Sequence, residues 1–186
     1  DVYWYMNVPL FGHVNPSLDL VQALVARNAT VFFFAAGDNF RRVVEDPSVG
    51  ARFVDYATVV PAGRTFDFVT ARGETNLFYV AREMFRAAEV ILEGITAALA
   101  AAKKGSEGGR RGWAACRPHA ILYDVSAVWG RFLGEIFRVP AVCCFPGLAP
   151  HLRFAMTSKT VIARFVREQY NGSTFRRETK EIAARL

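Results

Sequence analysis

A histidine and an aspartate each follow a strand-like segment of the sequence, and together they could act as a general base. His13 comes shortly after residues 2–8, which are rich in aromatic and β-branched side chains, and Asp124 directly follows residues 119–123. A carboxylate that accepts a hydrogen bond from one imidazole nitrogen fixes the tautomer, so the other nitrogen can take a proton from a hydroxyl. Because no G-x-S-x-G elbow is present, the pair indicates acid–base chemistry without a serine nucleophile.

Each of these two residues also has a simpler interpretation. His13 precedes Asn15 and Pro16, which favour the cap and the first position of a helix. The positive end of a helix dipole favours a neutral imidazole, which suits a base at neutral pH, but His13 could equally do no more than hydrogen-bond its loop. Asp124 could equally cap the helix that follows it, which is the commoner use of such an aspartate. Both alternatives stay open at this point.

The sequence lacks the motifs of several other kinds of site. The loop after residues 2–8 offers Gly12 alone, with no G-x-G-x-x-G and no G-x-x-x-x-G-K-[ST], so dinucleotide and P-loop sites lose their main support. The three histidines, His13, His119 and His151, are not spaced as in zinc sites, and we expect no metal. The three cysteines, two of them adjacent, do not suggest a disulfide framework.

The elements that must position His13 and Asp124 alternate along the chain. Apolar runs of strand length occur at residues 2–8, 30–36, 51–57, 119–123 and 141–145. Helical patterns occur at residues 15–28, 38–46, 74–102 and 126–137, with further helical material at 161–170 and 174–186. This alternation predicts an α/β fold with a doubly wound parallel sheet, and we expect residues 1–186 to form one domain. Ligands of such sheets bind beyond the carboxyl ends of the strands, where His13 and Asp124 fall.

The composition is that of a globular protein. The chain has 186 residues, 52% of them hydrophobic, and 23 Lys and Arg against 17 Asp and Glu, for a net charge of +6. The basic residues lack the aromatic interleaving of nucleic-acid modules, so we expect no nucleic acid partner, while a weak contact with a membrane surface stays open. Glu89 and Glu93 interrupt the most apolar helix, which rules out a run of about 18 apolar residues spanning a membrane. No leader is visible, so the cytoplasm is the default location.

Two segments of the sequence resemble one enzyme family. Residues 9–18 (PLFGHVNPSL) are similar to the opening of the inverting UDP-glycosyltransferases, particularly their macrolide glycosyltransferase branch. Residues 118–124 (PHAILYD), leading through 129–131 (WGR) to 139–142 (VPAV), resemble the central strand, helix and next strand of that family. The resemblance implies a GT-B fold, in which two Rossmann-like domains face each other across a cleft. This chain matches the N-terminal, acceptor-binding domain and contains no Gly-rich, His-containing diphosphate motif, so we expect a fragment that is inactive alone.

The resemblance also implies roles for individual residues. His13 would be the general base that removes the proton of an acceptor hydroxyl, and Asp124 would orient it, so that a hexosyl group passes from a UDP-sugar with inversion. The family needs no metal or other cofactor, because fixed donors and a helix terminus stabilise the leaving diphosphate. The residues near that diphosphate would be Gly12, Asn15 and Ser17. The acceptor, a lipophilic small molecule with a hydroxyl group, would contact Phe11, Phe66, Phe68, Phe145 and Leu148, although core packing would explain these apolar residues as well.

Two other functions stay open. A non-catalytic ligand-binding or partner subunit of a split or degenerate glycosyltransferase would share these sequence features. A GT-B nucleotide-sugar epimerase would share the fold. The pairing of His13 with Asp124 favours a transferase that activates a hydroxyl over the epimerase.

Overall fold

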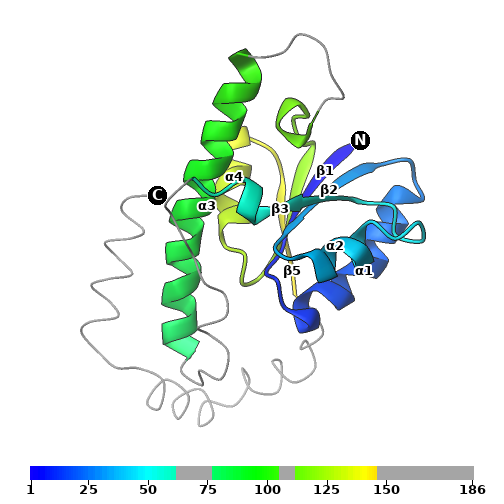
Figure 1. Cartoon of the computed structure of the whole chain (residues 1–186), viewed down its shortest axis with the longest axis horizontal. Helices are drawn as coiled ribbons and strands as arrows, with labels where there is room; N and C mark the ends of the chain where they lie inside the picture. Colours follow the sequence, from blue (N-terminus) through cyan, green and yellow to red (C-terminus); the bar gives the residue numbers. More distant parts are fainter. Residues whose placement is uncertain (62–76, 105–111, 146–186) are drawn as a thin grey trace.

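A parallel sheet of five strands runs through the part of the chain that the computed structural model describes, residues 1–61, 77–104 and 112–145 (Figure 1). The strands are β1 (Val2–Met6), β2 (Thr30–Ala35), β3 (Arg52–Asp55), β4 (Ala120–Asp124) and β5 (Ala141–Cys144). Their order in the sheet is β3-β2-β1-β4-β5, so the direction of winding reverses between β1 and β4. All neighbouring strands pair in parallel, which confirms the α/β class and the predicted type of sheet.

Helices cover both faces of this sheet (Figure 1). One face carries α1 (Phe11–Val25) and α2 (Asp38–Val44), and the other carries α3 (Leu77–Lys104) and α4 (Trp129–Phe137). Two short 3-10 turns, η1 (Tyr56–Thr58) and η2 (Trp113–Ala115), follow β3 and precede β4. The helical segments predicted at 161–170 and 174–186 lie outside the described residues. The winding of the sheet reverses between β1 and β4, so a ligand is expected to bind at the carboxyl ends of these two strands.

The side chains of β2 explain why a continuous apolar run forms a central strand. Successive side chains of a strand point to opposite faces of the sheet, so a strand covered on both faces must be apolar throughout. Phe32 and Phe34 pack into the cluster under α3 and α4, while Phe33 and Ala35 pack into the cluster under α1 and α2. All four are buried. The neighbouring strand β1 divides its side chains between the two faces in the same way.

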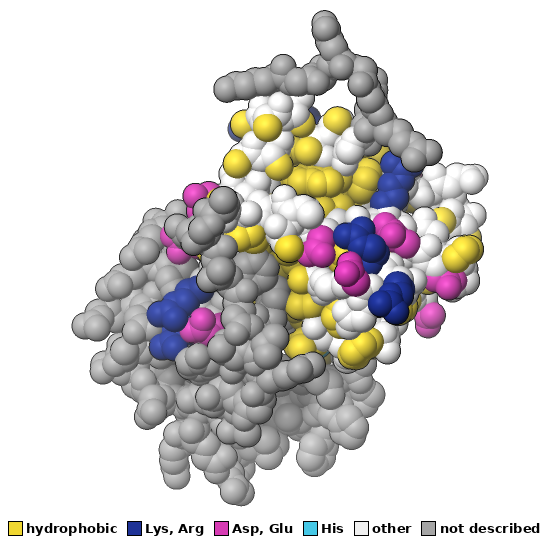
Figure 2. Space-filling model, viewed as in Figure 1, with side chains coloured by type: hydrophobic (Ala, Val, Ile, Leu, Met, Phe, Trp, Pro, Cys, Tyr) yellow, Lys and Arg dark blue, Asp and Glu magenta, His cyan; other side chains and the backbone are white. Residues whose placement is uncertain are grey.

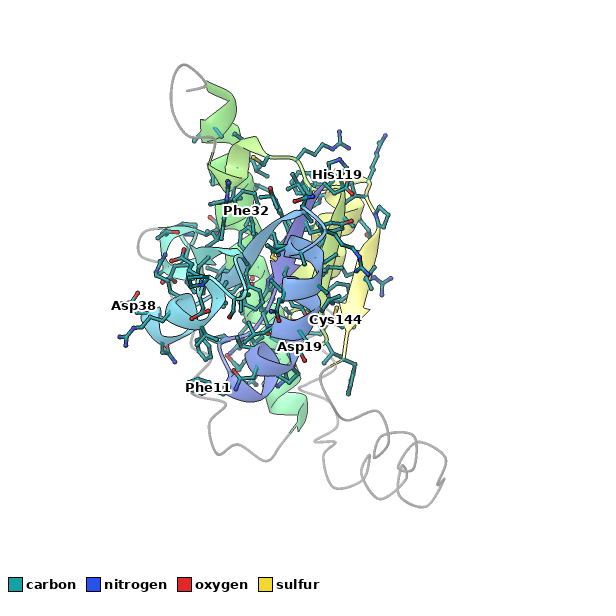
Figure 3. All side chains as sticks on the ribbon, turned by 90° about the vertical axis from the view of Figure 1, so that its right-hand side faces the viewer. Phe11, Asp19, Phe32, Asp38, His119 and Cys144 are labelled. Atoms are coloured by element: carbon teal, nitrogen blue, oxygen red, sulfur yellow. The ribbon has the colours of Figure 1, made fainter. Side chains whose placement is uncertain are left out.

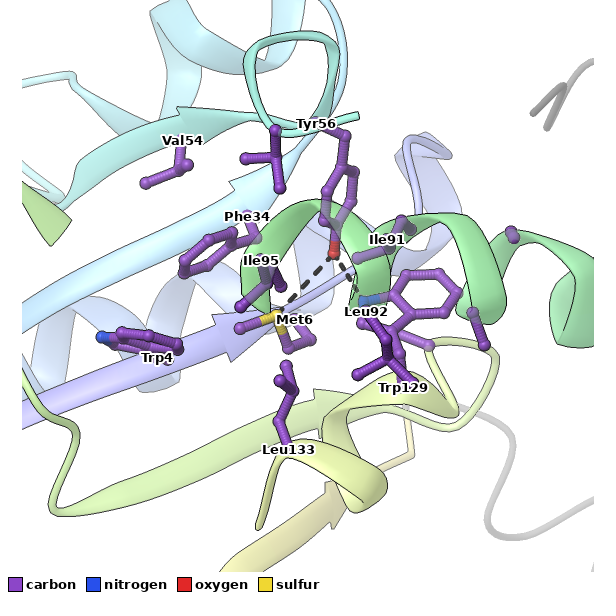
Figure 4. Packing of buried hydrophobic residues seen from close by; sticks show 14 of the residues in the cluster. Trp4, Met6, Phe34, Val54, Tyr56, Ile91, Leu92, Ile95, Trp129 and Leu133 are labelled. Atoms are coloured by element: carbon purple, nitrogen blue, oxygen red, sulfur yellow. Dashed lines mark hydrogen bonds between the residues drawn. The ribbon is translucent and has the colours of Figure 1, made fainter. Parts of the chain in front are cut away.

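The hydroxyl of Tyr56 makes buried polar contacts between elements in the core under α3 (Figure 4). The indole Nε1–H of Trp129, at the start of α4, donates to the hydroxyl of Tyr56 at 2.9 Å. That hydroxyl also lies 4.0 Å from Sδ of Met6, the last residue of β1. The contact satisfies two polar groups that would otherwise be costly to bury, and it ties α4 and η1 to the end of β1.

Two glycines allow helices to lie unusually close to their neighbours. A Cβ atom on Gly94 of α3 would collide with the carbonyl group of Val59, just after η1. A Cβ atom on Gly130 of α4 would collide with the side chain of Tyr123 in β4. α3 therefore approaches the segment after η1, and α4 approaches β4, at distances that only glycine permits.

The first helix begins at Phe11, whereas the sequence predicted Asn15 as its cap and Pro16 as its first residue. Val14 is fully buried in the core under α1, and this packing outweighs the local capping preference of Asn15. Leu10 occupies the N-cap position and makes no side-chain cap. Pro16 therefore lies inside the helix, where it has no N–H to donate to the carbonyl of Gly12. The prediction of this boundary was wrong, and its correction puts His13 within the first helical turn.

Charged side chains of both signs lie together near α2. In Arg41, Nε is 3.5 Å from Oδ1 of Asp38, Nη1 is 3.7 Å from Oε1 of Glu45, and Nη2 is 3.9 Å from Oδ2 of Asp55. Figure 2 shows basic and acidic side chains next to one another on the described part of this face. This region therefore has mixed charge. Within the described ranges, no helix has the length and apolar character needed to cross a membrane.

Candidate active site

The imidazole of His13 lies at the carboxyl edge of the sheet, in the first turn of α1. β1 ends at Met6, and a short connection leads from it to the helix. The side chain of His13 is 27% exposed, so it is anchored in the fold yet open to a ligand. Figure 3 shows Phe11, two residues earlier, and His119 toward opposite ends of the molecule. His119 accepts a hydrogen bond from the amide of Val2 at 2.9 Å and lies away from the candidate site.

The carboxylate of Asp124 is in direct contact with His13. Nδ1 of His13 is 3.0 Å from Oδ1 and 3.0 Å from Oδ2 of Asp124. Asp124 is the last residue of β4, which pairs with β1, so the two residues meet where the winding of the sheet reverses. The Asp124 side chain is only 1% exposed, which strengthens its electrostatic interaction with the imidazole. The two residues that sequence spacing singled out are thus brought together.

The carboxylate of Asp124 also accepts a backbone hydrogen bond. The amide of Ser126 donates to Oδ1 at 2.8 Å, and the amide of Ala127 donates to the main-chain carbonyl of Asp124 at 2.8 Å. Asp124 therefore caps this turn and not α4, whose N-cap residue is Val128 and carries no side-chain cap, so the alternative that Asp124 caps the following helix is wrong. The same carboxylate contacts the amide of Ser126 in its own turn and the imidazole of His13.

The contact determines what the imidazole can do. A carboxylate only accepts hydrogen bonds, so the neutral imidazole must carry its proton on Nδ1. Nε2 then has a free lone pair, and within the described part of the chain it has no hydrogen-bond partner. An imidazole with this tautomer and this exposure can take a proton from a hydroxyl group that approaches the edge of the sheet. The resulting imidazolium would be stabilised by Asp124.

Two buried tyrosines near this pair are poor alternatives as acid–base groups. Burial raises the pKa of Tyr56 far above its usual range, and the nearby charge of Asp124 raises it further. Burial is also the main cause that raises the pKa of Tyr5, with a smaller contribution from Cys144. Both phenols therefore stay protonated at neutral pH and serve as hydrogen-bonding core residues. His13 is the group at this edge whose chemistry suits proton transfer near neutral pH.

The start of α1 has main-chain donors that no carbonyl of the described chain uses. The first amides of any helix lack intrahelical partners, and among the described residues those of Phe11 and Gly12 make no backbone hydrogen bond. Gly12 is exposed, with no atom within 4 Å of the place where a Cβ would stand, and Asn15 is also exposed. Ser17 differs, because it is buried and its hydroxyl donates to the carbonyl of Val14 at 2.6 Å. Gly12 and Asn15 are thus accessible to an anion, whereas the hydroxyl of Ser17 is occupied.

Several apolar side chains are exposed where helices begin or strands end at this edge of the sheet. Phe11 is 54% exposed and packs on the buried Phe40, with 4.8 Å between ring centroids. Phe145, just after β5, is 44% exposed. Leu10 and Val125 are exposed as well and were missed by the sequence analysis, although each lies next to a residue of the site. The other three predicted acceptor contacts, Phe66, Phe68 and Leu148, lie outside the described residues.

The sequence analysis also missed a buried polar residue directly after β1. Asn7 is fully buried, and its side chain reaches the main chain of His13. The available signal was a polar residue at the end of an otherwise apolar strand, in front of the loop that carries the candidate base.

Solved glycosyltransferase structures share this fold. SnogD, a glycosyltransferase from Streptomyces nogalater, matches with a TM-score of 0.54 and 21% sequence identity, over 90% of this chain and 38% of SnogD. CalG4, the calicheamicin glycosyltransferase, matches with a TM-score of 0.52 and 21% identity, over 96% of this chain and 43% of CalG4. The chain has the fold of a GT-B glycosyltransferase domain.

This chain spans only about two fifths of the length of these two glycosyltransferases. A third glycosyltransferase, VinC, matches with a TM-score of 0.51 and 16% identity, over 92% of this chain and 40% of VinC. No protein-family model matches the sequence, and no curated protein matches it. At these identities the fold is what this chain shares with the solved structures, and the roles of the site residues must be argued from their own geometry.

Proposed function

We propose that this GT-B domain is the N-terminal, acceptor-binding half of an inverting nucleotide-sugar-dependent glycosyltransferase. In this proposal His13 is the general base and Asp124 is its partner. The observation that carries the proposal is the contact of Nδ1 of His13 with both carboxylate oxygens of Asp124, at 3.0 Å each. The contact leaves Nε2 available at the edge of the sheet where ligands of doubly wound folds bind.

The proposed reaction is a single displacement at the anomeric carbon. The acceptor hydroxyl gives its proton to Nε2 of His13 while its oxygen forms a bond to the anomeric carbon of the sugar. The bond between that carbon and the phosphate oxygen breaks, and its electron pair leaves with the nucleoside diphosphate. Attack on the face opposite the leaving group inverts the anomeric configuration. The positive charge on His13 is balanced by the buried carboxylate of Asp124.

The proposed donor is a hexose linked to a nucleoside diphosphate, such as a UDP-sugar. VinC, which has the same fold, was solved in complex with dTDP, which supports a donor of this chemical class. The amides of Phe11 and Gly12 and the side chain of Asn15 are the groups of this chain that would contact the diphosphate. The remaining donor contacts would come from a second domain, because this chain covers only about two fifths of its structural neighbours.

The proposed acceptor is a lipophilic small molecule with a free hydroxyl group. Apolar side chains that are exposed without being needed in the core favour an apolar ligand. Phe11 and Phe145 are such side chains, and they belong to segments that end at the same edge of the sheet as His13. Phe66, Phe68 and Leu148 stay predicted acceptor contacts.

The test is the release of nucleoside diphosphate by a protein that contains this chain and a donor-binding domain. His13→Ala should lower kcat about 10²- to 10⁴-fold, the usual contribution of a general base, and leave donor affinity unchanged. His119→Ala is the control, because His119 lies away from the site, and it should keep full activity. Full activity in His13→Ala, or a product with retained anomeric configuration, would refute the proposal. Binding of donor and acceptor without release would instead indicate a non-catalytic partner.

A further inference from the structure

We infer that Asn7 is a positioning residue, which holds the turn of α1 that carries His13 at the correct place above β4. This inference rests on the proposed function, because positioning matters for catalysis only if His13 is the base. Asn7 follows β1 directly and is fully buried. Its main-chain N–H donates to the carbonyl of Phe34, in the neighbouring strand β2, at 3.0 Å. Its main chain is therefore hydrogen-bonded to the sheet.

The side chain of Asn7 connects this sheet to the first turns of α1. Nδ2 donates to the main-chain carbonyl of His13 at 3.3 Å and to Oγ of Ser17 at 3.2 Å. Oδ1 accepts from the amide of Val8 at 2.7 Å. An amide N–H can only donate, so this last contact fixes which end of the carboxamide is oxygen and which is nitrogen. All the polar atoms of the Asn7 side chain are thus engaged.

Ser17 completes the connection on the helix side. Its hydroxyl accepts from Asn7 and donates to the carbonyl of Val14 at 2.6 Å. Ser17 is buried, and apart from tyrosine and tryptophan the three polar side chains buried in the described part of the chain are Asn7, Ser17 and Asp124. Two of these three hold the helix that carries His13, and the third contacts its imidazole. We call Asn7 and Ser17 the clamp.

The clamp matters because the turn that it holds is short of a helical hydrogen bond. Pro16 has no N–H, so the carbonyl of Gly12 lacks the partner that it would have in an ordinary helix. No side chain caps the start of the helix either. The first turn therefore depends on bonds from outside the helix, and the bond from Asn7 to the carbonyl of His13 reaches the main chain of the base itself.

The expected effect of removing the clamp is a displaced imidazole. A misplacement of about 1 Å at a catalytic group can cost on the order of 100-fold in rate. We therefore expect Asn7→Ala to lower kcat ten- to a hundredfold and to leave KM for the donor nearly unchanged. Ser17→Ala leaves the bond from Asn7 to His13 and should have a smaller effect. Ser17→Thr keeps the hydroxyl group, so it should recover most of the kcat that Ser17→Ala loses.

A spectroscopic test separates positioning from loss of stability. The protein is labelled with ¹⁵N-histidine, the His13 signals are assigned with His13→Gln, and the spectra are recorded at alkaline pH, where imidazole is neutral. The wild type should show the protonated type of signal for Nδ1 of His13, because Asp124 accepts from it. Asn7→Ala should show a mixture of both tautomers. Ile95→Val is the control for a general loss of packing, because it removes one methyl group from the core under α3. It should keep the wild-type tautomer of His13.

The outcomes distinguish the clamp from the proposed function. A folded Asn7→Ala protein with the wild-type tautomer and wild-type kcat would overturn the inference. A shifted tautomer together with full activity in His13→Ala would support the clamp as a structural device while refuting the role of His13 as base. If Asn7→Ala does not fold, the same comparison is made between Ser17→Ala and Ser17→Thr, and equal spectra and rates for these two would overturn the inference.

Discussion

Nδ1 of His13 is equally distant, at 3.0 Å, from the two carboxylate oxygens of Asp124, a residue 111 positions further along the chain. One of these oxygens, Oδ1, is also held by the amide of Ser126 at 2.8 Å. The main chain of its own turn therefore holds the carboxylate in place independently of the imidazole. This arrangement lets a buried charge keep its position, and it predicts how variants of Asp124 should differ.

Asp124→Asn should abolish most turnover while changing stability little. The asparagine keeps the shape of the side chain and an oxygen for the amide of Ser126, but its –NH₂ would face Nδ1 of His13 and favour the wrong tautomer. We expect kcat to fall about 10²- to 10⁴-fold, as for loss of the base itself. Release of nucleoside diphosphate by the two-domain protein measures this. Asp19→Asn, an exposed carboxylate on α1, is the control and should be fully active.

Phe11→Ala should weaken acceptor binding with little effect on the chemical step. Phe11 is exposed beside the site and packs on Phe40, so its ring offers a surface for an apolar ligand. The expected rise in KM for the acceptor is three- to tenfold, which corresponds to about 1 kcal/mol of lost contact energy. Leu20→Ala removes another exposed apolar side chain, later on α1, and should leave KM unchanged. An unchanged KM in Phe11→Ala would exclude Phe11 from the acceptor site.

The stability of the fold should decrease above about pH 10, where tyrosine in an unfolded chain ionises. Burial raises the pKa of Tyr5 and Tyr56 in the folded protein, so above this pH the unfolded state binds fewer protons than the folded state. The free energy of unfolding must then fall as pH rises. The stabilisation is complete below about pH 10 and is lost progressively above it. Urea denaturation at several pH values measures this.

Absorbance of tyrosinate gives an independent measurement of the same effect. Tyr5 and Tyr56 should ionise only together with unfolding, whereas exposed phenols ionise in the native state. Tyr56→Phe should reduce the pH dependence of stability above about pH 10, because one of the groups whose pKa is raised by burial is removed. A smooth titration of all six tyrosines without unfolding would contradict the prediction.

Gly94→Ala should destabilise the packing of α3 without touching the site. The added methyl group would meet the main-chain carbonyl of Val59, which cannot move without disturbing η1. Overpacking of this kind costs about 1–3 kcal/mol. Gly112→Ala is the matched control, because no atom lies within 4 Å of its Cβ position, and its stability should equal that of the wild type. Urea denaturation of both variants is the measurement, and equal midpoints would contradict the prediction.

The strands could be predicted because each is encoded by its own local pattern. The run predicted at residues 30–36 forms β2 (Thr30–Ala35), since a strand covered on both faces must be apolar at every position. The start of α1 could not be predicted in the same way. Asn15 and Pro16 have the residue types of a helix start, but the burial of Val14 and the hydrogen bond from Asn7 extend the helix back to Phe11. Here contacts between distant segments outweigh a local preference of about 1 kcal/mol.

For the candidate site as well, some features could be predicted from the sequence and others depend on the tertiary structure. The sequence by itself determined that a histidine and an aspartate would each follow a strand and that the strands would pair in parallel, because residue type and apolar periodicity are local properties. Only the tertiary structure decided that β4 lies next to β1, which puts Asp124 within 3.0 Å of His13. It also decided that Asn7 and Ser17 face each other under the first turn of α1. Such contacts depend on which segments are neighbours in space, and that is set by the packing of the whole chain.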